Sequence, residues 1–135
     1  MYKRIIAFDV GDVWIGVAHT DLLQTIAIPL ATWKTNEFDA KFRDYLILYP
    51  VDVVLIGLPK TLKNHSSEQT NKVYAWYEGI RGKYPDTHFV LIDERLSSQF
   101  AKNILVSSKS KKNSDHSLAA AIILENYLLS KNILE

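Results

Sequence analysis

The sequence predicts an α/β domain with a mixed sheet and helices on both faces. Three strand-like runs follow one another at the start of the chain, which predicts an antiparallel group. The remainder alternates apolar strand-type runs with segments of helical spacing, which is typical of parallel strands joined by crossover helices. The 135 residues suit one compact core and contain no linker-like stretch, so we expect a single domain over 1–135.

Five segments are expected to be strands. Residues 4–10 and 13–20 are apolar, β-branched runs around Gly11-Asp12, which predicts a hairpin. A third run covers 25–33, where Pro29 favours an edge strand or a bulge because proline has no N–H to donate. The last two runs, 51–57 and 88–93, are nearly continuous apolar stretches, as in strands buried on both faces.

Helical segments separate and follow these strands. Apolar residues recur at helical spacing after the third strand, and a capping-box spacing, a hydroxyl followed three residues later by Gln, precedes the next helix. A short helix capped by Ser97 or Ser98 and a longer one that begins near Ser114-Asp115 are expected last, with a polar, basic loop between them. In chain order the helices cover 36–49, 66–80 with its cap, 97–105 and 114–129, and the loop covers 107–113.

Composition narrows the class of protein. The net charge of +1 does not indicate a nucleic-acid partner, so any such surface must be local. The chain has no cysteine, which leaves oxygen or imidazole ligands for a metal. Apolar runs are far shorter than the roughly 18 residues of a membrane span, and Asp9 interrupts the only stretch placed like a signal peptide. We therefore expect a cytoplasmic protein with no membrane partner.

Three acids stand beside positions that must face the core. Asp9 lies near the end of a hydrophobic strand, Glu94 directly follows another, and Asp115 opens a helix whose face at i+3, i+4 and i+7 is apolar. Carboxylates in such positions are costly unless a partner compensates, and a divalent cation is the strongest one. Two strand ends and one helix start can converge beyond the carboxyl ends of the strands, where sites of open sheets lie.

Each of these residues also has an ordinary structural interpretation. Asp115 alone suits a helix cap, Glu94 alone suits an ion pair with Arg95, and Asp9 alone suits a turn. Strand alternation directs Asp93 away from the side of Glu94, so it is expected to be structural. Four histidines lack a convergent metal-ligand spacing; we expect His19 to be structural and the others to lie on the surface or in loops, namely His65, His88 and His116.

Four motifs, taken together, resemble one family. They are Asp9–Asp21 (DVGDVWIGVAHTD), Ile56–Pro59 (IGLP), Asp93–Ser98 (DERLSS) and Asp115–Tyr127 (DHSLAAAIILENY). Their order and spacing are similar to those of the YqgF family, also called RuvX, whose members are described as nucleases acting on the 5′ side of pre-16S rRNA or as Holliday junction resolvases. The motifs span nearly the whole chain, so chance agreement is very improbable.

The resemblance implies a ribonuclease H-like fold with a five-stranded mixed sheet. It also implies a metal-dependent endonuclease for the 5′ end of pre-16S rRNA, with Asp9, Glu94 and Asp115 as catalytic residues and ligands of Mg²⁺ or Mn²⁺. Cleavage of four-way DNA is the alternative activity, and a non-catalytic nucleic-acid scaffold is the alternative of another class. An ATP-binding actin or sugar-kinase relative would need two such domains. The chain is expected to act as a monomer or homodimer.

Substrate contacts are expected from two polar loops that flank the acids, although solvated side chains are the ordinary explanation for any single lysine. The family usually carries basic or small polar residues where Val13-Trp14 stand here, so this turn is expected to have lost a phosphate contact. Asn64 stands near a usual glycine and can adopt the left-handed conformation that such a turn needs. The expected nucleic-acid-binding residues are Lys60, Lys63, Arg95, Lys109, Lys111 and Lys112.

Overall fold

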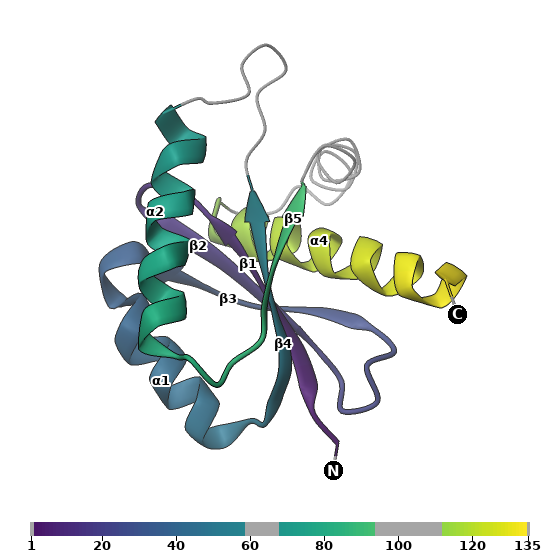
Figure 1. Ribbon diagram of the computed structural model, residues 1–135. Coiled ribbons are helices and arrows are strands. Elements are labelled where there is room, and N and C mark those ends of the chain that lie inside the picture. Colours follow the sequence, from purple (N-terminus) through teal and green to yellow (C-terminus); the bar gives the residue numbers. More distant parts are fainter. Residues whose placement is uncertain (1, 59–67, 94–111, 135) are drawn as a thin grey trace.

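The computed structural model describes residues 2–58, 68–93 and 112–134 (Figure 1). At residues 58, 68–70, 93, 112–115 and 132–134 it describes the course of the backbone only. Five strands form one sheet in the order β3-β2-β1-β4-β5. The strands are β1 (Arg4–Val10), β2 (Trp14–Thr20), β3 (Ala27–Lys34), β4 (Val51–Leu58) and β5 (Phe89–Asp93).

The sheet is mixed, as predicted. Strand β2 pairs antiparallel with β1 and β3, whereas β4 pairs parallel with β1 and β5. β3 is an edge strand, and its register with β2 shifts between Val17 and Ala18, where Ala18 lies opposite Pro29. Both outcomes that Pro29 favoured, an edge and a bulge, are therefore present.

Helices cover both faces of this sheet (Figure 1). A 3₁₀ turn η1 (Thr35–Glu37) leads into α1 (Phe38–Leu48), which shares one face with α2 (Glu68–Lys83). The long helix α4 (Lys112–Leu134) covers the other face. It begins earlier than expected, so Lys112 and Asn113 belong to a helix and not to the loop, because no glycine or proline interrupts the helix before Ser114-Asp115. The short helix expected over 97–105 lies outside the described residues.

The two faces carry different cores. On the side of α1 and α2, bulky side chains pack around Phe8, whose ring centroid lies 5.0 Å from that of Phe38 and 5.4 Å from that of Phe42. On the side of α4 the buried residues are smaller, including Ala7, Ala18 and Ala120. Small residues let a helix approach a sheet closely, so α4 lies near the strands. None of the described helices is long and apolar enough to cross a membrane.

Strand alternation assigns each β1 side chain to one of these faces. Ile6 and Phe8 belong to the α1–α2 core, whereas Ile5 and Ala7 belong to the α4 core. Successive side chains of a strand point to opposite faces, so Asp9 continues the row that faces α4. The carboxylate of Asp9 therefore ends an otherwise apolar row on the side of the central strand that faces α4.

Candidate functional site

Asp9 lies in the central strand between two glycines. It is the register partner of Gly16 in β2 and of Gly57 in β4, and Gly57 is in turn the partner of Ile92 in β5. Opposite residues of paired strands point to the same face, and Ile92 packs in the α4 core together with Ala7. The half-buried Asp9 thus has no side chain on either neighbouring strand to crowd its carboxylate.

Helix α4 approaches the sheet closely beside Asp9. A Cβ placed on Gly16 would overlap the backbone carbonyl of His116, so the α4 backbone occupies the space that a side chain would need. Asp115 directly precedes His116, and its backbone therefore lies in the helical turn that rests on the strand next to Asp9. The structure brings the first and third predicted acids to the same end of the same face, and it describes the side chain of Asp9 alone.

The remaining predicted site residues are only partly placed. Strand β5 ends at Asp93, which is the partner of Leu58, and Glu94 follows outside the described residues. Lys112 begins α4, and only its backbone is described. The other predicted nucleic-acid contacts lie outside the described residues, namely Lys60, Lys63, Arg95, Lys109 and Lys111.

The carboxylate of Asp9 suits a hard divalent cation. Among the described residues it forms no hydrogen bond and no ion pair, although it is half-buried on an apolar face. A carboxylate in that position is stabilised by a cation, and Mg²⁺ prefers oxygen ligands of this kind. Within the described part of the chain no three acidic or histidine side chains gather at one point. The Asp9 carboxylate therefore fits a metal ligand, and the described residues do not define the other ligands.

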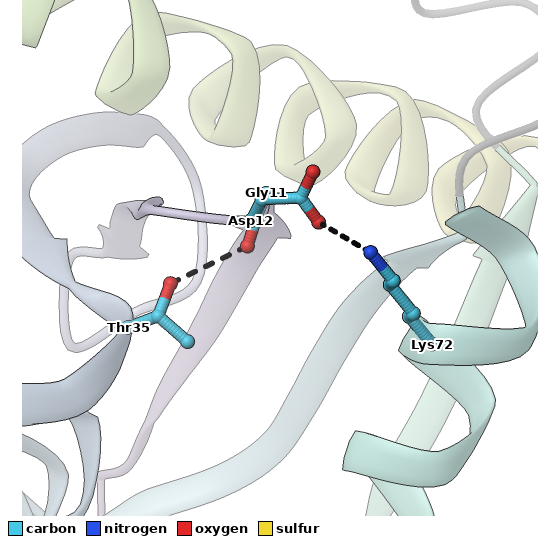
Figure 2. A network of polar contacts seen from close by, with 4 residues as sticks. All are labelled: Gly11, Asp12, Thr35 and Lys72. Atoms are coloured by element: carbon cyan, nitrogen blue, oxygen red, sulfur yellow. Dashed lines mark hydrogen bonds and ion pairs between the residues drawn. The ribbon is translucent and has the colours of Figure 1, made fainter. Parts of the chain in front are cut away.

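The turn between β1 and β2 is fixed by hydrogen bonds to the residue after β3 (Figure 2). The N–H of Thr35 donates to the carbonyl of Val13 over 2.8 Å. The Thr35 hydroxyl donates to the carbonyl of Gly11 over 3.3 Å, the hydrogen bond drawn in Figure 2. Asp12 pairs with Lys72 of α2, with 3.8 Å between Oδ1 and Nζ. The acid at the tip of this turn is therefore directed toward α2, whereas Asp9 faces α4.

Sequence reasoning missed one cation beside Trp14. Lys34 is the register partner of Trp14, and its Nζ lies 5.8 Å from the centroid of the indole ring. The turn at Val13-Trp14 is expected to have lost a phosphate contact, and the structure places the positive charge of the adjacent strand beside it. The pairing of β2 with β3 was the signal that could have revealed it, but the bulge beside Pro29 hides that register in the sequence.

The histidines are mostly as expected. His19 is buried in the α1-side core and its Nδ1 lies 2.8 Å from the hydroxyl of Tyr45, which confirms a structural role. Burial, and then the positive charge of Arg4, lower the pKa of His19 below 6.5. His88 is exposed in a loop, as predicted. His116 is half-buried and lies in α4, within the helix that the sequence predicted. His65 lies outside the described residues.

One large hollow among the described residues is unrelated to these acids. It measures about 550 Å³ and lies between the end of α2 and the start of β5, with Tyr77, Arg81 and Phe89 in its lining. Asp9 is near the carboxyl end of β1, which runs parallel to β4 and β5, so this hollow is at the opposite end of the sheet. We therefore place the site by the acid and not by the volume of a cavity.

The strand order, the helices on both faces and the acid at the end of the central strand define a ribonuclease H-like domain. Its fold matches that of Thermus thermophilus RuvC, with a TM-score of 0.61 for "T. thermophilus RuvC in complex with Holliday junction substrate". That comparison covers 97% of this chain and 96% of the other at 14% sequence identity, so it shows the fold alone. The family model described as "RuvX: Holliday junction resolvase" matches residues 3–130. The chain belongs to the RuvX family, a family of nucleases.

Two relatives show how similar this chain is in sequence to other proteins of the family. A protein of Parabacteroides distasonis is 37% identical over 134 residues, which cover 95% of this chain and 96% of that protein. A protein of Rubrobacter xylanophilus is 35% identical over 128 residues, which cover 93% of this chain and 91% of the other. Both are named as candidate pre-16S rRNA nucleases. The resemblance inferred from the four motifs is thereby confirmed over the length of the chain.

Proposed function

We propose that this protein is a metal-dependent endonuclease that hydrolyses phosphodiester bonds and uses Asp9, Glu94 and Asp115 to hold Mg²⁺ or Mn²⁺. The observation that carries the proposal is the position of Asp9. Its half-buried carboxylate has no partner among the described residues, and the α4 backbone next to Asp115 packs on Gly16, the register partner of Asp9. An acid without a partner beside the start of an acid-bearing helix supports a shared cation.

The sequence favours, for Glu94, the side of the sheet on which Asp9 lies. Ile92 packs in the α4 core, and Glu94 stands two residues later in the sequence. Alternation along an extended chain gives residues two apart the same side, so Glu94 would share the side of Asp9 and Asp93 would not. Three carboxylates with a substrate phosphate are enough for Mg²⁺, which keeps several waters.

The chain contributes position and charge to the reaction. Hydrolysis forms a bond from a water oxygen to phosphorus and breaks the bond from phosphorus to the leaving oxygen. When bound, the metal supplies water activation and neutralises charge on the phosphoryl group. Gly16 and Gly57 place no side chain beside Asp9 on the neighbouring strands, and the α4 backbone fills the space over Gly16. The apolar face around Ala7 and Ile92 excludes water behind the Asp9 carboxylate, which strengthens electrostatic interactions in front.

We assign the 5′ end of pre-16S rRNA as the substrate, which would place the reaction in the cytoplasm. The names of the Parabacteroides and Rubrobacter relatives support this assignment. A four-way DNA junction is the second candidate, supported by the description of the family model and by the fold shared with RuvC. A non-catalytic scaffold is the alternative of another class. Either a monomer or a homodimer is consistent with these activities.

One substrate panel separates these three functions. The protein is incubated with RNA that carries the 5′ leader of 16S rRNA, with single-stranded DNA and with a four-way DNA junction, each with Mg²⁺, Mn²⁺ or EDTA. We expect cleavage of the RNA that depends on the metal. Cleavage confined to the junction would replace the RNA assignment by the resolvase assignment. Binding without cleavage of any substrate, with either metal, would support the scaffold and contradict the proposal.

A further inference from the structure

Trp14 lies on the same face of the sheet as Asp9. It stands two residues before Gly16, which contacts α4, and four before Ala18, which packs in the α4 core. Residues at these spacings in one strand share a face. Because Asp9 is the partner of Gly16, Trp14 is its diagonal neighbour, at about 7–8 Å in the geometry of antiparallel pairs. An aromatic ring is thus placed one step beyond the proposed metal ligand.

Lys34 adds positive charge beside the Trp14 ring. Its ammonium lies 5.8 Å from the centroid of the Trp14 ring, and among the described residues it forms no ion pair. Asp12, the nearest acid in the sequence of this turn, is instead paired with Lys72 of α2. A hollow of about 430 Å³ opens beside Lys34 and is lined by Asp12, Val13, Lys34, Thr35 and Asn36. The lysine is exposed and can reach a phosphate in this space.

Hydrogen bonds hold the backbones that carry the ring and the ammonium in a fixed relation. The N–H of Gly11 donates to the carbonyl of Trp14 over 3.0 Å, and Thr35, directly after Lys34, donates to the carbonyls of Gly11 and Val13. Both strand ends are therefore tied to one turn. A rigid aromatic ring with a neighbouring cation is the arrangement by which proteins hold unpaired nucleotides, since every base has a face that can stack.

We propose that Trp14 and Lys34 form a platform that holds an unpaired nucleotide of the substrate strand beside Asp9. The base stacks on the indole of Trp14, and the Lys34 ammonium leaves the ring to contact the adjacent phosphate. A cation over an aromatic ring at an exposed site is held weakly, so this exchange is easily made. The inference rests on the proposed nuclease function. It also explains how the chain binds its substrate without basic residues at Val13-Trp14.

Binding is measured by fluorescence anisotropy with a labelled single-stranded RNA in EDTA, so that no cleavage occurs. A single-stranded DNA of the same sequence and a blunt RNA duplex are the comparison probes. The variants are Trp14→Ala, Trp14→Phe, Lys34→Ala and Lys34→Arg. Tyr74→Ala on α2 and Lys41→Ala on α1 are matched controls, because each removes an exposed aromatic or basic side chain from a helix on the other face of the sheet.

We expect Trp14→Ala to weaken binding of the single strands by about 5- to 100-fold, the range measured for stacked bases, and to affect the duplex much less. Trp14→Phe should restore most of this loss. Lys34→Ala should reduce the slope of log K against log salt concentration by about 0.7, the value for one phosphate contact on a single strand, whereas Lys34→Arg keeps the slope. Trp14→Ala should leave that slope unchanged. If either residue had only a structural role, its replacement would change neither the salt slope nor the preference for single strands.

The platform and the nuclease function fail in different ways. Variants of Trp14 and Lys34 that bind no worse than Tyr74→Ala and Lys41→Ala would overturn the platform, as would a parent protein that binds no single strand. Metal-dependent cleavage with either result would leave the nuclease function intact. Binding that depends on Trp14, in a protein that cleaves nothing, would instead overturn the nuclease function and keep the platform.

Discussion

Gly16 and the backbone of His116 occupy the same small space between β2 and α4. A Cβ on Gly16 would overlap the carbonyl oxygen and carbon of His116 and would lie 3.1 Å from its Cα. The absence of a side chain at Gly16 is therefore what allows the start of α4 to rest on the strand beside Asp9. This contact links packing to chemistry, because it sets the distance between the helix that carries Asp115 and the strand that carries Asp9.

Replacing Gly16 by Ala should separate α4 from the sheet at this point. The added Cβ would meet the backbone of His116, which cannot rotate away. We therefore expect a loss of about 1–3 kcal/mol or more in the free energy of unfolding, as for overpacked cores. Metal affinity should fall as well, because the two acids move apart. Denaturant unfolding and metal titration by calorimetry measure the two effects.

Gly79→Ala is the matched control for that substitution. Gly79 lies in α2, and a Cβ there would meet nothing within 4 Å. Alanine is a better helix former than glycine, so this variant should be up to about 1 kcal/mol more stable and should bind metal like the parent. Equal stability of the Gly16 and Gly79 variants would contradict the role given to the α4 contact.

The sequence predicted the strands better than it predicted the contacts between elements that are distant in the chain. Apolar runs placed all five strands because burial leaves a periodic pattern, and they correctly placed Asp9 near the end of a hydrophobic strand. The contact of Gly16 with His116 joins residues 100 positions apart, and no local pattern encodes it. The cation at Trp14 was missed for a similar reason, since it depends on the register of β2 with β3.

Stability should depend on pH through His19. Burial and the charge of Arg4 lower the pKa of His19 in the folded state below its ordinary value of 6.5. As the pH falls below about 6.5, the unfolded chain therefore binds more protons at His19 than the folded protein does. The free energy of unfolding should therefore decrease as the pH falls through about 6.5, by at most about 1.4 kcal/mol per pH unit, and level off below the folded-state pKa. Denaturant unfolding at several pH values between about 5 and 7.5 measures this dependence.

His19→Gln removes the titrating group from the core and should flatten that dependence. His88→Gln, which changes an exposed loop histidine, should keep the slope of the parent. The loss of the hydrogen bond between His19 and Tyr45 is expected to cost about 0.5–1.5 kcal/mol at neutral pH, independently of the slope. A slope that is the same in the parent and in His19→Gln would show that other groups control the acid sensitivity.

Lys111 and Lys112 should contribute to binding and not to chemistry. Replacing Lys111 and Lys112 by Ala should weaken binding to a similar degree for all sequences, because phosphate contacts read no bases. Each lost contact should reduce the salt slope for a single strand by about 0.7, with turnover at saturating substrate little changed. Anisotropy titrations over a range of salt concentrations, followed by single-turnover cleavage, test both parts. An unchanged slope with slower turnover would contradict a role in phosphate binding.

The most direct test of the nuclease assignment compares Asp9→Asn with Asp44→Asn, the same change at an exposed position of α1. Cleavage of the 16S leader RNA is measured at saturating substrate and Mg²⁺, together with unfolding of the metal-free proteins. Asp9→Asn should keep or gain stability, because it removes one of the three negative charges that are proposed to share the metal. Its cleavage rate should fall by about 100-fold or more, since a metal contributes several kcal/mol to the transition state, while Asp44→Asn cleaves like the parent. Equal rates for Asp9→Asn and the parent would contradict the assignment of Asp9 as a metal ligand of a nuclease.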